Sequence, residues 1–118
     1  MSSKLDEIPN VEIDGSGKFK YIQIKVKEKE TGNTKIIVRG YSHCPYHADI
    51  LDEVKTQYKG LFGFTCPGGG RIEHDANAKT IFIYGFSQAY GQPDHSVAAN
   101  LLKEKYPDYK ITFSNDGY

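Results

Sequence analysis

His47 is the side chain in this sequence best suited to move a proton or to attack phosphorus. It follows Pro45 by two residues, at the point where apolar residues at helical spacing begin, so we expect it in the first turn of a helix. The partial positive charge at a helix N-terminus disfavours imidazolium and keeps such a histidine neutral near neutral pH. A neutral imidazole accepts protons and is a nucleophile. A histidine that only hydrogen-bonds to a loop carbonyl would give the same pattern.

Arg39 and Arg71 are the two arginines among the 15 basic residues. A guanidinium can bind phosphate through two parallel hydrogen bonds, which an ammonium group cannot do. Arg39 precedes Gly40, and Arg71 follows three glycines, beside which backbone N–H groups can approach an anion closely. Surface ion pairs are the alternative role for both arginines, and a shared direction toward one site would distinguish the two roles.

Lys20 and the segment from Ser87 to Ala89 complete the candidate phosphate contacts. Lys20 shares a face with the apolar residues of an expected strand, where an ammonium group is costly unless it is paired. It could bind a phosphoryl oxygen there, or it could reach solvent at the strand end. Ser87, Gln88 and Ala89 follow the most strand-like segment, where a loop can offer backbone N–H groups to phosphate; an ordinary polar turn is the alternative.

The sequence also contains residues for two alternative chemistries, a cysteine nucleophile and a metal site. Cys66 and Arg71 form Cys-x₄-Arg, one residue short of the Cys-x₅-Arg loop with which tyrosine phosphatases surround phosphate. A set of potential metal ligands is also present: His43, Cys44, His47, Cys66 and His74. Because Pro45 interrupts the His-x₃-His spacing, the first two histidines are not expected on one helical face. We therefore expect neither a cysteine nucleophile nor a metal or other cofactor.

Bulk composition excludes several classes of protein. The 118 residues carry 15 basic and 15 acidic side chains, without the basic excess of a nucleic-acid binder. No apolar run approaches a membrane span, and the first residues are too charged for a signal peptide. We expect a cytoplasmic monomer, in which Cys44 and Cys66 are free thiols. Signatures of P-loop hydrolases, the serine-hydrolase elbow and the Arg-His-Gly phosphatases are missing.

The pattern along the chain predicts one domain over residues 1–118, with residues 1–7 frayed. Alternation over 20–26, turn residues at 30–33 and a β-branched run over 35–41 predict a hairpin. A helix is expected from residue 47 to Gly60, followed by a Gly-rich connection over 66–71 that leads into a short strand through His74.

The second half of the sequence contains two further expected strands and a helix. The strands cover residues 80–87 and 109–113, and the helix between them starts at the cap Asp94 and ends before Pro107. Runs of strands interrupted by two helices predict an α+β fold, with a mixed sheet of about six strands.

Several segments, in order along nearly the whole chain, resemble the phosphohistidine phosphatase (janus) family. They are FKY (19–21), VRGY (38–41), YHADI (46–50), GGGR (68–71), YGFSQAYG (84–91), KYPDY (105–109) and NDGY (115–118). The resemblance implies a monomeric α+β domain, with a mixed sheet flanked by two helices, that works without metal. The sequence departs from the family pattern at Gln88, where a known family member has methionine, and around residues 42–45.

The resemblance also implies roles for individual residues. His47 matches the active-site histidine, described as the proton acceptor, and Lys20 matches a contact to the substrate phosphate. Ser87, Gln88 and Ala89 match the phosphate-binding loop, and Arg39 and Arg71 match arginines near the site. The implied reaction is hydrolysis of the P–N bond of phosphohistidine in proteins, with phospholysine as a further substrate. The competing class is a non-catalytic module that binds phosphate or phosphoprotein through the same pocket.

Overall fold

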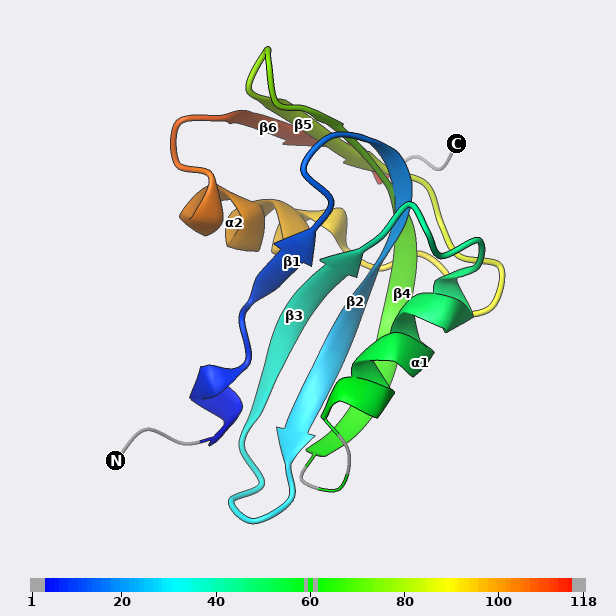
Figure 1. The fold of residues 1–118 in the computed structure, drawn as a ribbon, viewed down its shortest axis with the longest axis vertical. Helices are drawn as coiled ribbons and strands as arrows, with labels where there is room; N and C mark the ends of the chain where they lie inside the picture. The colour runs from blue at the N-terminus through cyan, green and yellow to red at the C-terminus, as the bar shows by residue number, and fades with distance from the viewer. Residues whose placement is uncertain (1–3, 59, 61, 116–118) are drawn as a thin grey trace.

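The computed structural model describes residues 4–58, 60 and 62–115. The long strand β2 (Gly17–Glu28) lies near the centre of a six-stranded sheet (Figure 1). The elements follow one another as η1 (Lys4–Glu7, a 3₁₀ helix), β1 (Val11–Ile13), β2 (Gly17–Glu28), β3 (Thr34–Gly40), α1 (His47–Gln57), β4 (Phe62–Asp75), β5 (Thr80–Tyr84), α2 (His95–Lys105) and β6 (Lys110–Phe113). The sheet order is β1-β3-β2-β4-β5-β6.

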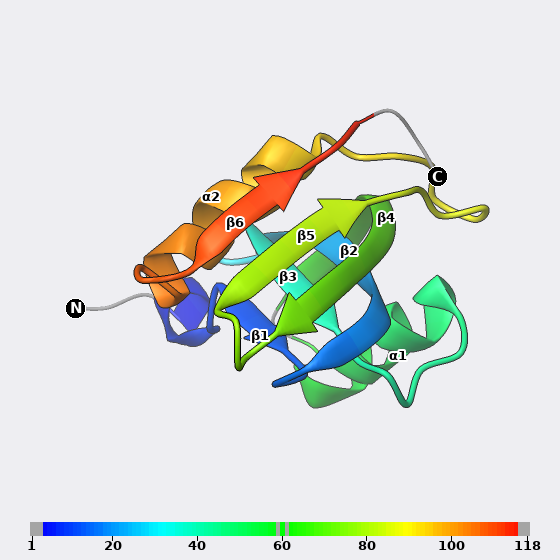
Figure 2. The same cartoon turned by 90° about the horizontal axis from the view of Figure 1, so that it is seen from above.

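The sheet is mixed, as the sequence predicts. The four middle strands pair antiparallel: β3 with β2, β2 with β4 and β4 with β5. The short outer strands pair parallel, β1 with β3 and β6 with β5. The sheet curls, so that β6 lies beside α2 when the molecule is seen from above (Figure 2). The predicted α+β class with two helices and the predicted hairpin of β2 and β3 are both confirmed.

Alternate side chains of β2 belong to two different cores. Ile22, Ile24 and Val26 pack in one buried cluster with the apolar residues of α1. Tyr21 lies in the other cluster, with the buried residues of α2. Because successive strand residues point to opposite faces, α1 and α2 cover opposite faces of the sheet. The strand is buried on both faces, whereas its alternation predicted one inward face.

The Gly-rich segment is not the connection that we expected. It lies inside β4, which runs without interruption from Phe62 to Asp75. A Cβ on Gly69 would lie 2.8 Å from the His47 ring, and a Cβ on Gly70 would lie 2.2 Å from the Tyr84 carbonyl oxygen and 2.8 Å from the His95 ring. The glycines are therefore needed because two histidine rings and a neighbouring strand press on β4 from both faces.

Both helices begin where the sequence predicts. The Tyr46 N–H donates to the Asp49 carboxylate at 3.0 Å, which holds the start of α1. The Asp94 carboxylate accepts a hydrogen bond from the Ser96 N–H at 3.0 Å and caps α2. The strand predicted over 80–87 is shorter, because Gly85 adopts a positive φ of 83° immediately after Tyr84.

Elements near the N-terminus are missing from the sequence prediction. Strand β1 is only three residues long, too short to show an alternating pattern. Residues 4–7, which we expected to fray, form η1, and Leu5 is buried in the α1-side core. Residues 1–3 lie outside the described residues. Neither α-helix in the described part of the chain is long and apolar enough to cross a membrane.

Substituting Gly70 with alanine tests whether β4 needs its glycines. The new methyl group would collide with backbone and with the His95 ring, and such overpacking costs about 1–3 kcal/mol or more. We expect Gly70→Ala to lower the free energy of unfolding by at least that amount in urea titrations. Gly63→Ala is the matched control on the same strand, because a Cβ there meets nothing within 4 Å. Equal stability of the two variants would contradict this interpretation of the glycines.

Candidate functional site

A cavity of about 540 Å³ opens at the N-terminus of α1, between α1, the start of β2 and the loop after β5. Its lining residues come from four separate segments: Lys20, Pro45, Tyr46, His47, Ala48, Arg71, Phe86, Ser87, Gln88 and Ala89. Six of the seven residues predicted to form the site are therefore brought together. The lining contains two cations and no carboxylate, so the cavity is suited to an anion.

His47 is the first residue of α1, and only 7% of it is exposed. Its Nε2 lies 2.9 Å from the Gly70 carbonyl oxygen. Because a carbonyl can only accept, Nε2 must carry the hydrogen and donate it. The lone pair of the neutral ring is therefore on Nδ1, which becomes the atom available to accept a proton or a phosphoryl group.

The surroundings of His47 favour its neutral form. Burial lowers the pKa of the imidazole below its usual value, and the positive charges of Lys20 and Arg71 lower it further, whereas the hydrogen bond to Gly70 opposes the shift. The position at the helix N-terminus acts in the same direction as burial. The imidazole is therefore neutral at neutral pH.

Lys20 and Arg71 are direct partners across the antiparallel pair of β2 and β4. Directly opposed residues point to the same face, so both side chains lie on the face that α1 covers. Lys20 is half-buried and Arg71 is exposed. Within the described residues, no carboxylate forms a salt bridge with Lys20. The ammonium group therefore keeps its charge available to an anion in the cavity.

The loop after β5 forms the opposite wall. Ser87 and Gly91 exchange two backbone hydrogen bonds, of 3.1 and 2.8 Å, and the Tyr90 N–H donates to the Ser87 Oγ at 3.1 Å. The Ser87 amide is thus already paired. The amides of Gln88 and Ala89, at the exposed tip, make no hydrogen bond within the described part of the chain. These two amides, rather than that of Ser87, are the ones available to a phosphate oxygen.

A buried chain of side chains supports this loop from the other face of the sheet. The Tyr21 hydroxyl hydrogen-bonds to His95 Nδ1, and His95 Nε2 donates to the Gly85 carbonyl oxygen at 2.8 Å. Gln92 Nε2 donates to the same carbonyl at 3.1 Å. Burial lowers the pKa of His95, which stays neutral and uses both ring nitrogens for these bonds. His95 was not among the residues predicted from the sequence, where its place directly after the helix cap Asp94 was the one available signal.

Arg39 is the predicted site residue that the structure does not bring to the cavity. It is fully buried, and its guanidinium donates to the carbonyl oxygens of Val38 and Pro9, each at 2.9 Å. Arg39 lies opposite Ile22, two residues deeper along β2 than Lys20, and it extends toward the segment before β1. It therefore stabilises the packing of the N-terminal segment, and we do not include it among the phosphate contacts.

The geometry of Cys66 does not suit a nucleophile. Cys66 and Arg71 both lie on the extended strand β4, so the residues between them cannot curl around a phosphate. Burial raises the pKa of the Cys66 thiol to about 11, with a small opposing effect of its hydrogen bond to the Gly68 carbonyl. The thiol is therefore protonated at neutral pH and a poor nucleophile.

A slightly larger hollow of about 600 Å³ lies elsewhere, over the strands β4, β5 and β6. Its lining mixes Lys18 and Lys110 with Glu73 and Asp75, so it has no consistent charge for an anion. His74 also lines it, but its Nδ1 donates to the Asp14 carbonyl oxygen at 2.9 Å and its Nε2 lies 3.4 Å from the Tyr109 hydroxyl. This hollow therefore lacks the carboxylate-free lining that surrounds His47.

Two residues at the rim of the His47 cavity were not anticipated. Tyr46 is 70% exposed and Phe86 is 40% exposed, although both are large and apolar. Tyr46 directly precedes α1, and Phe86 lies in the loop after β5. Their signal in the sequence was their position next to predicted site residues.

The chain is similar to known proteins over most of its length. A profile of the Janus/Ocnus family matches residues 5–110. The 14 kDa phosphohistidine phosphatase of Sus scrofa is 44% identical over 99% of this chain and 98% of its own length. The protein of the same name from Homo sapiens is 45% identical over 94% of each chain. The sex-regulated protein janus-A of Drosophila pseudoobscura pseudoobscura is 44% identical over 97% of this chain and 80% of its own length. The chain belongs to the Janus/Ocnus family.

Proposed function

We propose that this protein is a phosphohistidine phosphatase, an enzyme that hydrolyses the P–N bond of phosphohistidine in proteins, with phospholysine as a further substrate. The observation that carries the proposal is a neutral His47 whose Nδ1 lone pair is free, at a cavity with Lys20 and Arg71 and without carboxylates. Relatives of nearly the same length that are named 14 kDa phosphohistidine phosphatase support the same reaction.

The arrangement suits phosphoryl transfer without a large covalent role for the protein. The transition state is loose, so catalysis depends mainly on position and on neutralising the charge of the phosphoryl oxygens. Lys20, Arg71 and the amides of Gln88 and Ala89 surround the space where these oxygens would lie. Water forms the new O–P bond, its proton moves to His47 Nδ1, and the P–N bond breaks as the leaving imidazole takes up a proton.

His47 could instead attack phosphorus itself and form a phosphorylated enzyme that water then hydrolyses. Both routes use the same Nδ1 lone pair, because Nε2 is held by Gly70. Acid quenching would destroy a phosphohistidine, so the routes are separated by alkaline quenching and detection of phosphate on His47.

The rim points to a polypeptide substrate. Exposed Tyr46 and Phe86 offer apolar surface on either side of the cavity, and aromatic side chains are the ones most often used as anchors at protein interfaces. We propose that they contact the residues that flank the phosphorylated histidine.

We also propose that the protein acts as a cytoplasmic monomer. The free state of Cys44 and Cys66 fits a reducing compartment. Sedimentation would test the oligomeric state, and localisation of a tagged chain would test the compartment.

A non-catalytic phosphate-binding module is the second candidate, because relatives at similar identity are named janus-A, for sex-regulated expression rather than for a reaction. Binding of a phosphohistidine peptide without release of phosphate would favour the module.

The central test measures phosphate released from a phosphohistidine peptide by the purified chain. We expect His47→Ala to lower the rate about 10²- to 10⁴-fold, because an acid–base group is lost. Cys66→Ser is the control and should remain near wild type, since its thiol is protonated and lies outside the cavity lining. We expect EDTA to leave the rate unchanged. An inactive Cys66→Ser variant would restore the cysteine mechanism, and loss of activity in EDTA would show that the reaction needs a metal.

The pH dependence follows from the lowered pKa of His47. Only the neutral imidazole accepts a proton, so kcat/KM should be level through neutral pH and fall on the acid side. Because burial and the two nearby cations lower the pKa, the midpoint of that fall should lie below the ordinary histidine value of 6.5. The measurement is a pH–rate profile, corrected for the acid hydrolysis of the substrate itself. A midpoint above the ordinary value would show that His47 is not the titrating group.

The role of Lys20 is tested against a neighbour on the same strand. Lys20→Met removes a charged contact to phosphate, and we expect kcat/KM to fall about 10- to 100-fold. The acid midpoint of the profile should also rise, because a positive charge beside His47 is lost. Lys18→Met is the matched control: Lys18 is exposed and pairs with Glu73 at 3.9 Å, so its loss should have no effect. Equal effects of the two variants would indicate a general effect of net charge.

A further inference from the structure

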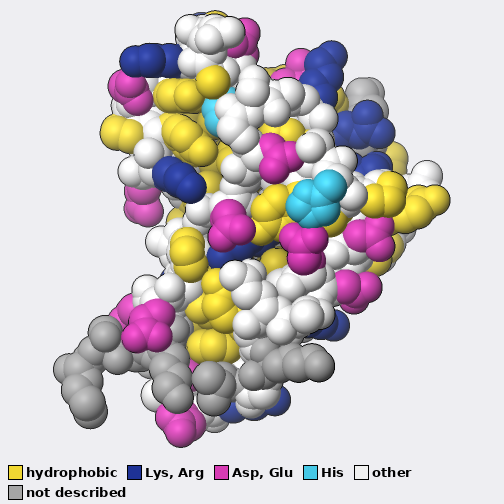
Figure 3. Space-filling view, viewed as in Figure 1, with side chains coloured by type: hydrophobic (Ala, Val, Ile, Leu, Met, Phe, Trp, Pro, Cys, Tyr) yellow, Lys and Arg dark blue, Asp and Glu magenta, His cyan; other side chains and the backbone are white. Residues whose placement is uncertain are grey.

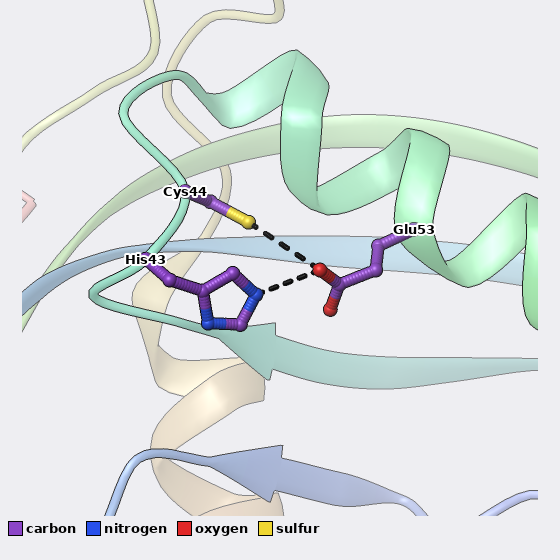
Figure 4. Close-up of side chains that lie close together, drawn as sticks. All are labelled: His43, Cys44 and Glu53. Atoms are coloured by element: carbon purple, nitrogen blue, oxygen red, sulfur yellow. Dashed lines mark hydrogen bonds and ion pairs between the residues drawn. The ribbon is translucent and has the colours of Figure 1, made fainter.

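Three side chains with different metal-binding atoms meet beside the start of α1. His43 and Cys44 lie in the connection between β3 and α1, and Glu53 extends from α1 toward them (Figure 4). His43 Nε2 is 2.7 Å from Glu53 Oε1, and Cys44 Sγ is 4.0 Å from the same oxygen. All three ligand atoms lie within 4.8 Å of one another. The reaction proposed for His47 uses none of them.

The three side chains are held in place by contacts of their own. The His43 ring stacks on Tyr41, with centroids 5.1 Å apart and planes at 18°. The Cys44 N–H donates to the Tyr41 carbonyl oxygen at 3.2 Å, and Cys44 is only 6% exposed. Glu53 is anchored by its place in the middle of α1. The side chains are therefore close to one another before any ion binds, which lowers the entropic cost of binding.

The surrounding charge is negative. Asp14, whose carboxylate accepts from the Ser42 N–H at 2.6 Å, interacts electrostatically with His43. Figure 3 shows acidic side chains gathered around a histidine on the face that carries α1. Burial raises the pKa of the Cys44 thiol, and the charges of Glu53, Asp49 and Asp14 raise it further. The same carboxylates attract a cation, which replaces the thiol proton when it binds.

We propose that His43, Cys44 and Glu53 form a binding site for one divalent cation of the zinc class. Imidazole nitrogen, thiolate sulfur and carboxylate oxygen are the three kinds of ligand that zinc accepts, at about 2.0–2.3 Å. Tetrahedral bonds of that length place ligand atoms about 3.3–3.8 Å apart. The separations of 2.7 and 4.0 Å lie on either side of this range, so side-chain adjustments of about 1 Å complete the site. The Cys44 proton leaves to solvent as the bond to sulfur forms.

The exposure of the cluster decides the kind of site. The side chains of His43 and Glu53 are 60% and 48% exposed, so the fourth position of a tetrahedral ion faces water. Three protein ligands and one water give an open coordination sphere, unlike that of a structural ion enclosed by four protein ligands.

A bound ion would connect the segment before α1 to the body of that helix. Pro45 and Tyr46, which follow Cys44 directly, line the His47 cavity, and Cys44 itself lines a smaller adjoining hollow with Lys20 and Arg71. The ion would thus hold residues next to the cavity without contacting the phosphoryl group, and hydrolysis would not require it. This inference does not depend on the proposed reaction, because the site would bind cations even if no P–N bond were hydrolysed.

Cobalt is the probe, because thiolate-bound Co²⁺ gives a near-ultraviolet charge-transfer absorption. We expect the reduced protein to develop this absorption with one equivalent of Co²⁺ and to lose it when Zn²⁺ displaces the cobalt. Cys44→Ser should abolish the absorption. Glu53→Gln should weaken Co²⁺ binding at least about 10-fold, since even outer-shell partners of a metal contribute that much.

Two variants serve as matched controls. Cys66→Ser retains Cys44 and should retain the absorption, and Asp52→Asn removes a neighbouring exposed carboxylate of α1 and should leave the affinity for Co²⁺ unchanged. Zinc should also slow amide hydrogen exchange over residues 42–46 in the wild type and not in Cys44→Ser. Cobalt binding without a thiolate absorption, an absorption that survives Cys44→Ser, or equal effects of Asp52→Asn and Glu53→Gln would overturn the proposal.

Discussion

The hydrogen bond from His47 Nε2 to the Gly70 carbonyl is the interaction on which the site depends. It joins the first residue of α1 to the middle of β4, so it fixes where the helix begins relative to the sheet. It also assigns the tautomer and leaves Nδ1 for chemistry. The bond can form because Gly69, with no side chain, lets the imidazole lie directly over the strand.

Adjacent glycines of β4 each leave room for a histidine ring, one on either face of the sheet. Gly69 accommodates His47 on the face covered by α1, and Gly70 accommodates His95 on the face covered by α2. His95 holds the Gly85 carbonyl, from which the loop of Gln88 and Ala89 begins. The two walls of the cavity are therefore both positioned against one short stretch of strand. Because His47 and His95 lie on opposite faces, the two walls of the cavity are linked across the sheet.

The sequence predicted features that depend on local chemistry. The Asp94 cap, the hairpin and the class of fold are confirmed. Lys20, His47, Arg71 and the 87–89 segment line one cavity, and their roles there stay predictions. Prediction from the sequence failed where long-range packing decides. Glycines usually indicate a connection, but here they remain in a strand because rings from distant segments need the space. Arg39 resembles Arg71 in sequence context, yet its position deeper along the sheet places it against Pro9.

A net charge of zero concealed a separation of charge along one short segment. On one side of residues 43–47, Lys20 and Arg71 stand beside His47, lower its pKa and create a positive cavity. On the other side, burial raises the pKa of the Cys44 thiol, and the charges of Glu53, Asp49 and Asp14 raise it further. The two sets of charges therefore favour ligands of opposite sign within a few residues of one another. The net charge of the chain does not show this separation. It is visible only in the fold, which brings β1, β2, β4 and α1 to the same segment.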